Sequence, residues 1–308
     1  MVLSKIGLTG ATGMLGRHIR AALESAGAQV VPVSRDSDPI RNVVGWNLKD
    51  WRSLKDLDLI FSDVQAVVHA GAMLPERPGV CDEGYMFNAN IRASFNLGLW
   101  AIERQVPIVY VSGAIVYKDQ EKLDLNENDE LGWGELGGFY GFSKLLAEDA
   151  LRRFCSDGLK LSVIRPSSIF GFGLPENKMV GSFLKAARAG EVISLEPPVD
   201  DRINFIHAAD VSLAILEILK LEVWDTFNIS SGSLLSIQEL AEACVAVSGR
   251  GSVEIIQENL PERAPIHRFS LNTDRAKTCL GWQPLLSIEQ GLKMMLDGNI
   301  CLGFEESI

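Results

Sequence analysis

Short apolar runs alternate with stretches of helical periodicity over the first half of the chain. The runs are rich in Val and Ile and apolar at consecutive positions, as in strands that are covered on both faces of a parallel sheet. They lie at residues 5–8, 29–33, 66–69, 108–111 and 161–164. Amphipathic helices are predicted between several of them, at residues 14–26, 88–105 and 140–155. This alternation favours an α/β fold with a doubly wound parallel sheet.

The pattern becomes less regular after the fifth predicted strand. Pro and Gly residues predict a loop over residues 166–178, and shorter helices and strands follow. We expect a first domain over residues 1–170, with residues 203–230 returning to it. A smaller C-terminal lobe would then comprise residues 171–202 and 231–308 and pack against the carboxyl edge of the sheet.

The segment "LTGATGMLG" joins the first predicted strand to the first predicted helix. Its three glycines are Gly10, Gly13 and Gly16. Glycine costs conformational entropy at such a junction, but it lets the backbone approach a pyrophosphate whose charge rests on the helix N-terminus. Because a strand precedes the segment and a helix and a second strand follow it, the pattern predicts a dinucleotide-binding site of the Rossmann type.

The residues after the second predicted strand bear on the choice of cofactor. An acidic residue there binds the ribose hydroxyls of NAD, whereas an arginine accepts the 2′-phosphate of NADP. This chain has Ser34 and Arg35 at that point. Arg35 favours NADP over NAD, although an arginine that is only exposed to solvent gives the same pattern.

A second motif, "GFYGFSK", opens the helix predicted at residues 140–155. It places Tyr140 and Lys144 four residues apart, and therefore on one face of that helix. A phenol has a usual pKa of about 10 and is a poor acid or base at neutral pH. A nearby ammonium group lowers the pKa of the phenol, so the pair is suited to exchange a proton with a hydroxyl or carbonyl group.

Composition and charge exclude several classes of protein. The net charge of −11 argues against a nucleic-acid partner, and it means that an anionic ligand must be held by local groups. No apolar run reaches the roughly 18 residues that a membrane helix needs, and we expect no signal peptide. The five cysteines are scattered without a metal-ligand spacing, which fits a reducing cytoplasm.

Further segments occur in the order typical of one family. The chain resembles the extended short-chain dehydrogenases/reductases, the NAD(P)-dependent epimerase/dehydratase family, over almost its whole length. Besides the two motifs above, the resemblance rests on "GWNLKD", "AVVHAGA", "NANIRASFNL", "IVYVSGAIVY", "RPSSIFGFG", "RINFIHAADVSLAI" and "NTDRAKTCLGWQPLLSIEQGL".

The resemblance implies roles for particular residues. Tyr140 would be the acid/base, Lys144 its partner and a ribose contact, and Ser112 the candidate for the catalytic hydroxyl. Substrate contacts would come from Ser168 and from two arginines, Arg202 and Arg263, for which a surface salt bridge is the alternative. The cofactor-binding residues would be Gly10, Thr12, Gly13, Met14, Leu15, Gly16, Arg35, Asn47, Leu48, Ala70, Gly71, Ala72, Tyr140, Lys144, Pro166 and Ser167. The family positions of His69 and His207 are usually structural, and no metal site is expected.

One position departs from the family pattern. The catalytic Ser or Thr usually lies four residues before the tyrosine that corresponds to Tyr117, and here that residue is Gly113. Successive strand residues point to opposite faces, so Ser112 cannot replace it without a local irregularity. Ser167 and Ser168 are alternative donors, and reduced or lost activity is a third interpretation.

The resemblance implies hydride transfer to or from a secondary alcohol or ketone of a sugar. A nucleotide-sugar 4-epimerase or 4-keto reductase is the first expectation. Alternatives are a reductase of a small non-nucleotide carbonyl compound and a non-catalytic NAD(P)-binding sensor. Family members commonly form homodimers through two helices, and Phe95, Leu99 and Trp100 are candidates for that face, with core packing as the alternative.

Overall fold

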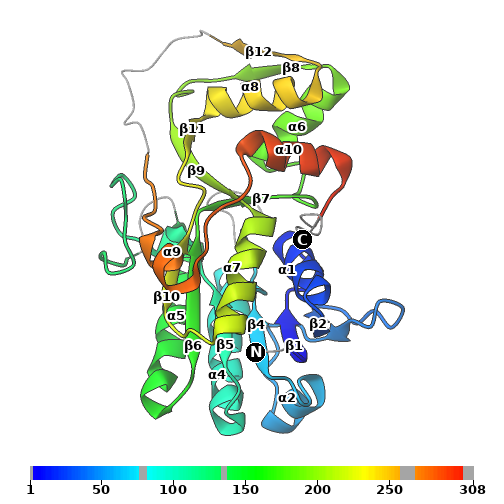
Figure 1. The fold of residues 1–308 in the computed structure, drawn as a ribbon, viewed down its shortest axis with the longest axis vertical. Helices are drawn as coiled ribbons and strands as arrows, with labels where there is room; N and C mark the ends of the chain where they lie inside the picture. Colours follow the sequence, from blue (N-terminus) through cyan, green and yellow to red (C-terminus); the bar gives the residue numbers. More distant parts are fainter. Residues whose placement is uncertain (1–2, 76–81, 133–136, 257–267, 301–308) are drawn as a thin grey trace.

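The protein is built around a seven-stranded parallel sheet (Figure 1). The computed structural model describes residues 3–75, 82–132, 137–256 and 268–300. The strand order is β10-β6-β5-β4-β1-β2-β3. The strands are β1 (Lys5–Thr9), β2 (Gln29–Ser34), β3 (Val44–Gly45), β4 (Ala66–His69), β5 (Ile108–Val111), β6 (Leu161–Pro166) and β10 (Thr226–Ile229). The chain order reverses between β1 and β4, and in such sheets ligands bind at the carboxyl ends of the strands that flank the reversal.

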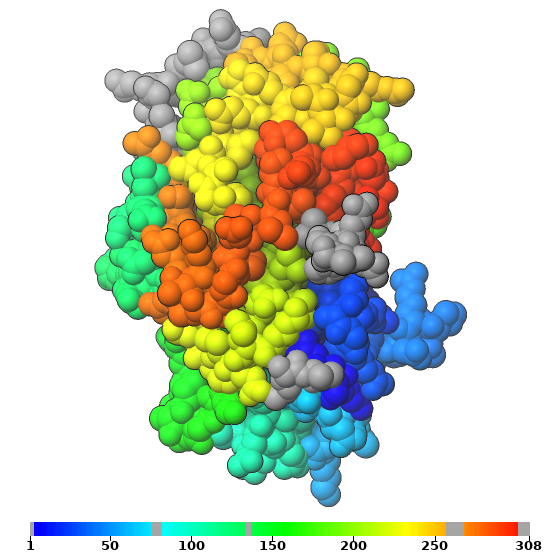
Figure 2. Space-filling model, in the orientation of Figure 1, coloured from blue at the N-terminus to red at the C-terminus, as the bar shows by residue number. Residues whose placement is uncertain are grey.

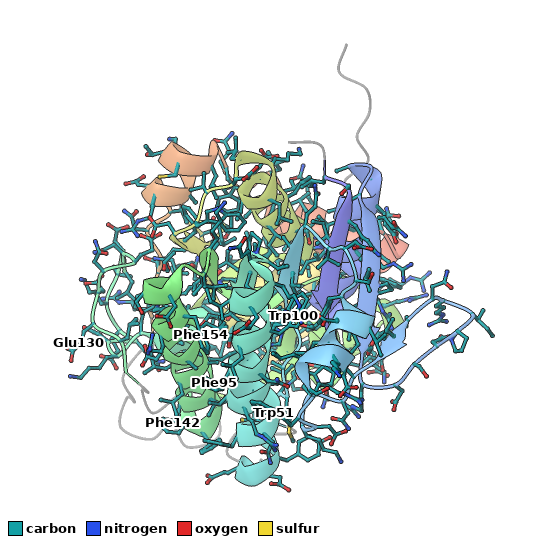
Figure 3. The ribbon with its side chains drawn as sticks, turned by 90° about the horizontal axis from the view of Figure 1, so that it is seen from below. Trp51, Phe95, Trp100, Glu130, Phe142 and Phe154 are labelled. Atoms are coloured by element: carbon teal, nitrogen blue, oxygen red, sulfur yellow. The ribbon has the colours of Figure 1, made fainter. Side chains whose placement is uncertain are left out.

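Helices cover both faces of this sheet, as Figure 3 shows from below. One apolar core lies between the sheet and helices α1 (Met14–Ser25), α7 (Ala208–Leu221) and α9 (Asp274–Leu280). A second core lies under α2 (Leu54–Ile60), α4 (Ala93–Arg104) and α5 (Gly138–Arg152). Both faces of the strands are therefore buried, which confirms the doubly wound sheet that the continuous apolar runs predict. No helix in the described ranges is long and apolar enough to cross a membrane.

A smaller lobe stands at the carboxyl end of the sheet and forms the upper part of Figure 2. It contains a three-stranded sheet, a two-stranded sheet and helices that share a third apolar core. The strands are β7 (Ser168–Phe170), β9 (Arg202–His207) and β11 (Leu234–Ser236), and β8 (Val192–Leu195) with β12 (Ser252–Ile255). The helices are α6 (Met179–Ala189), α8 (Ile237–Ser248) and α10 (Ile288–Asp297).

Three expectations need correction or qualification. Residues 166–178 are not all loop, because residues 168–170 form strand β7, which pairs with β9. The helix expected at residues 88–105 is divided into a π-helix η1 (Phe87–Arg92) and α4, and a short helix α3 (Glu83–Met86) precedes them. The division into two domains stays a prediction: α7 packs against α1 and β10 joins the main sheet, whereas β9 belongs to the small one.

Trp100 was a candidate for an interface and lies in the core instead. Its side chain is 2% exposed, and its indole N–H donates to Asp58 at 2.9 Å. In Figure 3 it lies on the sheet side of α4, whereas Phe95 lies farther out. The spacing of apolar positions on a helix with two apolar faces does not distinguish the inner face from the outer one.

Candidate active site

The glycine-rich loop after β1 has no room for side chains. A Cβ atom at Gly16 would lie 2.0 Å from the carbonyl oxygen of Gly10, and one at Gly10 would lie 2.7 Å from the Cα of Gly71. Gly10 also has a φ of +70°, in the left-handed region that glycine favours. The loop that follows β1 is therefore pressed against the loop that follows β4, at the reversal of the sheet.

Helix α1 begins directly at this loop without a side-chain cap. Its N-cap is Gly13, which offers no side-chain acceptor, and the first turn of the helix contains no acidic residue. The first backbone N–H groups of a helix have no partner within the helix, so they attract anions. The loop and the helix N-terminus thus fit a pyrophosphate group.

The residues expected around the adenosine half lie beside this loop. The hydroxyl groups of Thr12 and Ser34 are 2.5 Å apart, which joins the loop to the end of β2. Arg35 follows and is exposed. Leu48 packs against Gly71, because a Cβ atom at Gly71 would lie 2.8 Å from its Cδ1. Asn47 accepts a hydrogen bond from the backbone of Lys49 at 3.3 Å and caps a turn.

A buried chain of hydrogen bonds supports the two loops, and sequence reasoning missed it. The N–H of Gly71 donates to Thr9 Oγ1 (3.0 Å), which lies 2.7 Å from Nδ1 of His69. Nε2 of His69 lies 3.1 Å from Oγ of Ser94, and Ser94 donates to the carbonyl of Asn90 (2.6 Å). Because Ser94 uses its proton on that carbonyl, its oxygen accepts from His69 Nε2. Nδ1 of His69 then accepts from Thr9, so one neutral tautomer satisfies every group.

Asn90 extends this chain to helix α5. Its side chain accepts from the N–H of Met73 at 2.7 Å and donates to the carbonyl of the same residue at 3.0 Å. It also donates to Oγ of Ser143 at 2.9 Å. Ser143 directly precedes Lys144, so the loop after β4 is tied to the helix that carries the tyrosine–lysine motif. Asn90 lies in the π-helix η1, and π-helical turns are frequent at functional sites.

Tyr140 and Lys144 lie in the first two turns of α5, one helical turn apart. Lys144 is buried, donates to the carbonyl of Val111 at 2.8 Å and lies 5.0 Å above the ring of Tyr110. Burial lowers the pKa of Lys144 to about 8, although the carboxylate of Glu148 opposes this shift.

The pKa of Tyr140 moves in the direction opposite to our expectation. Burial raises it above its usual value, because the phenolate would lose its hydration. The phenol is therefore protonated at neutral pH in this environment. The Lys144 ammonium also affects His69, whose pKa is lowered to about 3 by burial first and by that charge second.

Position 113 has room for a Cβ atom. Gly113 has an extended backbone with a φ of 178°, and a Cβ atom there would meet only Cγ2 of Ile115, at 3.8 Å. The neighbouring Ser112 is buried, and its hydroxyl forms no hydrogen bond within the described residues. The same holds for Ser167, which follows β6 and Pro166. Two buried hydroxyl groups thus lie without partners on the ends of adjacent strands.

The residues expected to bind substrate are less well defined. Ser168 is exposed at the start of β7. Arg202 forms a salt bridge with Glu239 at 3.1 Å and donates to the carbonyl of Leu234 at 3.2 Å. Arg263 lies outside the described residues. No cluster of His, Cys, Asp and Glu in the described ranges is arranged to hold a metal ion.

Comparison with known proteins identifies the family. The model of the NAD dependent epimerase/dehydratase family matches residues 6–230. The chain belongs to this family. Its members are enzymes that bind NAD(P). The loop with Gly10, Gly13 and Gly16, together with the N-terminus of α1, fits the pyrophosphate of this cofactor and is called the glycine cradle below.

Solved structures of epimerase/dehydratase enzymes superpose on almost the whole chain. UDP-N-acetylglucosamine 4-epimerase from Bacillus cereus is 26% identical with a TM-score of 0.81, over 94% of this chain and 97% of that one. MoeE5 in complex with UDP-glucuronic acid and NAD is 21% identical with a TM-score of 0.81, over 96% and 98%. UDP-glucose 4-epimerase from Thermotoga maritima is 22% identical with a TM-score of 0.77, over 96% and 98%. The Rossmann-type fold and the family resemblance are thus confirmed, while the role of each site residue stays a prediction.

Proposed function

We propose that the protein transfers a hydride between NAD(P) and a secondary alcohol or ketone of a nucleotide sugar, as a 4-epimerase or a 4-keto reductase. The observation that carries this proposal is the position of Tyr140 and Lys144. Lys144 reaches the end of β5 from α5, and Tyr140 precedes it by one helical turn on the same face. Hydrogen bonds through Asn90 tie that helix to the loops of the glycine cradle. The bound cofactor supplies or accepts the hydride, and the side chains handle the proton.

The pKa shifts indicate which side chain can donate a proton in each direction of the reaction. Tyr140 has a raised pKa and therefore holds its proton, as an acid that protonates a carbonyl oxygen must. In the reverse direction, the phenol gives up its proton only if a positive charge stabilises the phenolate, and the Lys144 ammonium is the nearby cation on the same helix face. The hydroxyl groups of Ser112 and Ser167, which have no hydrogen-bond partner among the described residues, can donate to the reacting oxygen.

The nucleotide-sugar substrate is supported by the similar structures. MoeE5 was solved with UDP-glucuronic acid and with UDP-glucose, and the Thermotoga enzyme with UDP-glucose. Ser168, Arg202 and Arg263 are the proposed contacts for the substrate. Arg202 would have to exchange its salt bridge with Glu239 for a phosphate. For the cofactor we propose NADP, with NAD as the alternative, because Arg35 is exposed beside the Thr12–Ser34 pair.

A non-catalytic NAD(P)-binding sensor is the second candidate, and Gly113 is the observation that favours it. The family's hydroxyl donor is missing at that position, although a Cβ atom would meet no close contact there. A sensor needs only the glycine cradle, whereas an enzyme also needs Tyr140.

Substitution of Tyr140 tests the proposed function. The chain and its Tyr140→Phe variant would be incubated with UDP-glucose, UDP-N-acetylglucosamine and UDP-glucuronic acid, each with NAD⁺ or NADP⁺ and their reduced forms. We expect turnover of one of these sugars by the wild type and a loss of about 100-fold or more in the variant, because general acid–base catalysis contributes a factor of that order. The melting temperature should stay unchanged.

Tyr85→Phe is the matched control, because Tyr85 lies in α3 and its ring contacts Lys49, and neither residue has a proposed role in the reaction. It should keep full activity. Turnover that survives in Tyr140→Phe would exclude the proposed mechanism. Tight dinucleotide binding without turnover of any of the sugars would support the sensor.

We also propose a homodimer that forms through the outer faces of α4 and α5, and a cytoplasmic location. On α4, Phe95 is 38% exposed and Leu99 is half-buried one turn further on. Trp51 is 45% exposed nearby, under the guanidinium group of Arg92 at 5.4 Å. In Figure 3 these two residues flank α4, with Phe95 on the side of α5 and Trp51 on the opposite side.

A further inference from the structure

The first turns of helix α1 carry an arginine that the sequence motifs do not assign. Arg17 directly follows Gly16 and is exposed. Its Nε donates to the carbonyl of Thr12, inside the glycine-rich loop, at 2.9 Å. No carboxylate of the described residues forms a salt bridge with it, whereas Arg20 on the next turn pairs with Glu24 at 2.7 Å.

The position of this charge is unfavourable for the helix itself. The N-terminus of a helix carries a partial positive charge, which repels a cation in the first turns. No acidic side chain in the first turn of α1 compensates for it. A helical side chain also leans toward the N-terminus of its helix, so the guanidinium group lies back over the loop. Arg17 therefore adds its positive charge to the end of the helix that is already positive.

The geometry leaves the outer nitrogens of Arg17 free to bind a ligand. Nε is engaged by Thr12, but no hydrogen bond of Nη1 or Nη2 occurs within the described residues. A Cβ atom at Gly173 would lie 3.5 Å from Nη1, so the guanidinium group lies between the glycine-rich loop and the loop after β7. An anion on the N-terminus of α1 would meet this fork of N–H donors, which suits phosphate oxygens.

We propose that Arg17 binds the pyrophosphate of the dinucleotide. The protein has a net charge of −11, so its overall field repels a cofactor that is itself anionic. A fixed cation at the cradle offsets that repulsion locally. This inference rests on the NAD(P) binding of the family and does not depend on which sugar is the substrate.

The proposal separates two arginines by what each should recognise. The pyrophosphate is common to NAD and NADP, whereas the 2′-phosphate is present only in NADP. Loss of Arg17 should therefore weaken both cofactors equally, and loss of Arg35 should weaken NADP alone if Arg35 binds the 2′-phosphate.

Calorimetric titration of the full-length protein with NAD⁺ and with NADP⁺ tests this, after exchange of any retained nucleotide. Arg17→Met should raise both dissociation constants roughly tenfold, the size of one charge-assisted hydrogen bond, and should reduce their dependence on salt. The dissociation constants of Arg17→Lys should lie between those of the wild type and those of Arg17→Met. Arg20→Met is the matched control: it removes the same charge from the same helix and should change neither constant by more than about twofold.

Three results would overturn the assignment. The first is a change of less than about twofold in the dissociation constants on Arg17→Met. The second is an equal change of these constants on Arg20→Met, and the third is a loss of affinity in Arg17→Met for NADP⁺ alone. A wild-type protein that binds neither dinucleotide would contradict the cofactor site as a whole. If instead the wild type binds the dinucleotides and Arg17→Met binds them equally well, only the role of Arg17 is contradicted.

Discussion

Among single residues, Gly113 stands out because neither backbone conformation nor packing requires a glycine there. At Gly10 and Gly16 an added Cβ atom would collide with the backbone. At Gly113 it would make only an ordinary contact, and the φ of 178° is accessible to any residue. The glycine at position 113 therefore leaves space beside the candidate site.

Restoring a hydroxyl group at this position is a direct test. Gly113→Ser should change the free energy of unfolding by less than about 0.5 kcal/mol, because the side chain enters free space. Turnover should rise about tenfold, since a donor aimed at the reacting oxygen stabilises the transition state. Gly113→Ala is the control, because it adds the Cβ atom without the hydroxyl. Equal rates in the two variants would argue against a missing donor.

The sequence predicts the role of residues whose partners lie close to them in the chain. Gly10, Gly13 and Gly16 follow one another in a loop, and Tyr140 and Lys144 are one helical turn apart. The hydrogen-bond chain through His69 could not be predicted in this way, because its links span 60 residues to Thr9 and 25 to Ser94. Only the folded sheet brings β1, β4 and η1 together.

At the scale of elements, the same limit explains why the sequence predicts a single α-helix over residues 88–105. Residues 88–105 have continuous helical periodicity, but the turn around Asn90 is a π-helix. The side chain of Asn90 holds Met73, and its carbonyl accepts from Ser94. These contacts favour a wider turn that the periodicity of the sequence does not encode.

The junction of β9 and α7 permits a prediction about pH. His207 caps α7, because its Nδ1 accepts from the N–H of Ala209 at 3.2 Å. Burial first, and the nearby ring of His18 second, lower the pKa of His207 to about 3. In the unfolded chain His207 has its usual pKa of 6.5. Between pH 6.5 and about 3, His207 is therefore protonated in the unfolded chain and neutral in the folded protein. Stability from this residue is therefore complete above pH 6.5 and falls as the pH drops toward 3.

His207→Asn isolates this effect, because asparagine keeps a good cap acceptor and cannot titrate. Between pH 6 and 4, the free energy of unfolding of the wild type should fall more steeply than that of the variant, by about 1.4 kcal/mol per pH unit. Urea unfolding at a series of pH values measures both slopes. The variant is expected to be less stable at pH 8, because it leaves a cavity, but parallel slopes would show that His207 is already charged in the folded protein.

At the scale of the whole molecule, the main sheet and the presence of a smaller lobe were predictable, but the strand pairing within the lobe was not. The strands β1, β2, β4, β5 and β6 alternate with helices, and right-handed crossovers then restrict their arrangement to a few orders. The small sheet joins β7, β9 and β11, which are three residues, six residues and three residues long and far apart in the sequence. Such short strands carry almost no periodicity of their own, so their pairing depends on tertiary packing.

The outer face of α4 leads to the last prediction, which concerns assembly. Each copy carries a net charge of −11, so association has to come from apolar contact and should be stronger at high salt. Leu99→Lys places a charge within the proposed interface and should convert a dimer to a monomer in size-exclusion chromatography with light scattering. Leu59→Lys is the control, because Leu59 is 82% exposed on α2 and should leave the dimer intact. A wild-type protein that elutes as a monomer at both low and high salt would refute the homodimer, and equal dissociation by both variants would place the interface elsewhere.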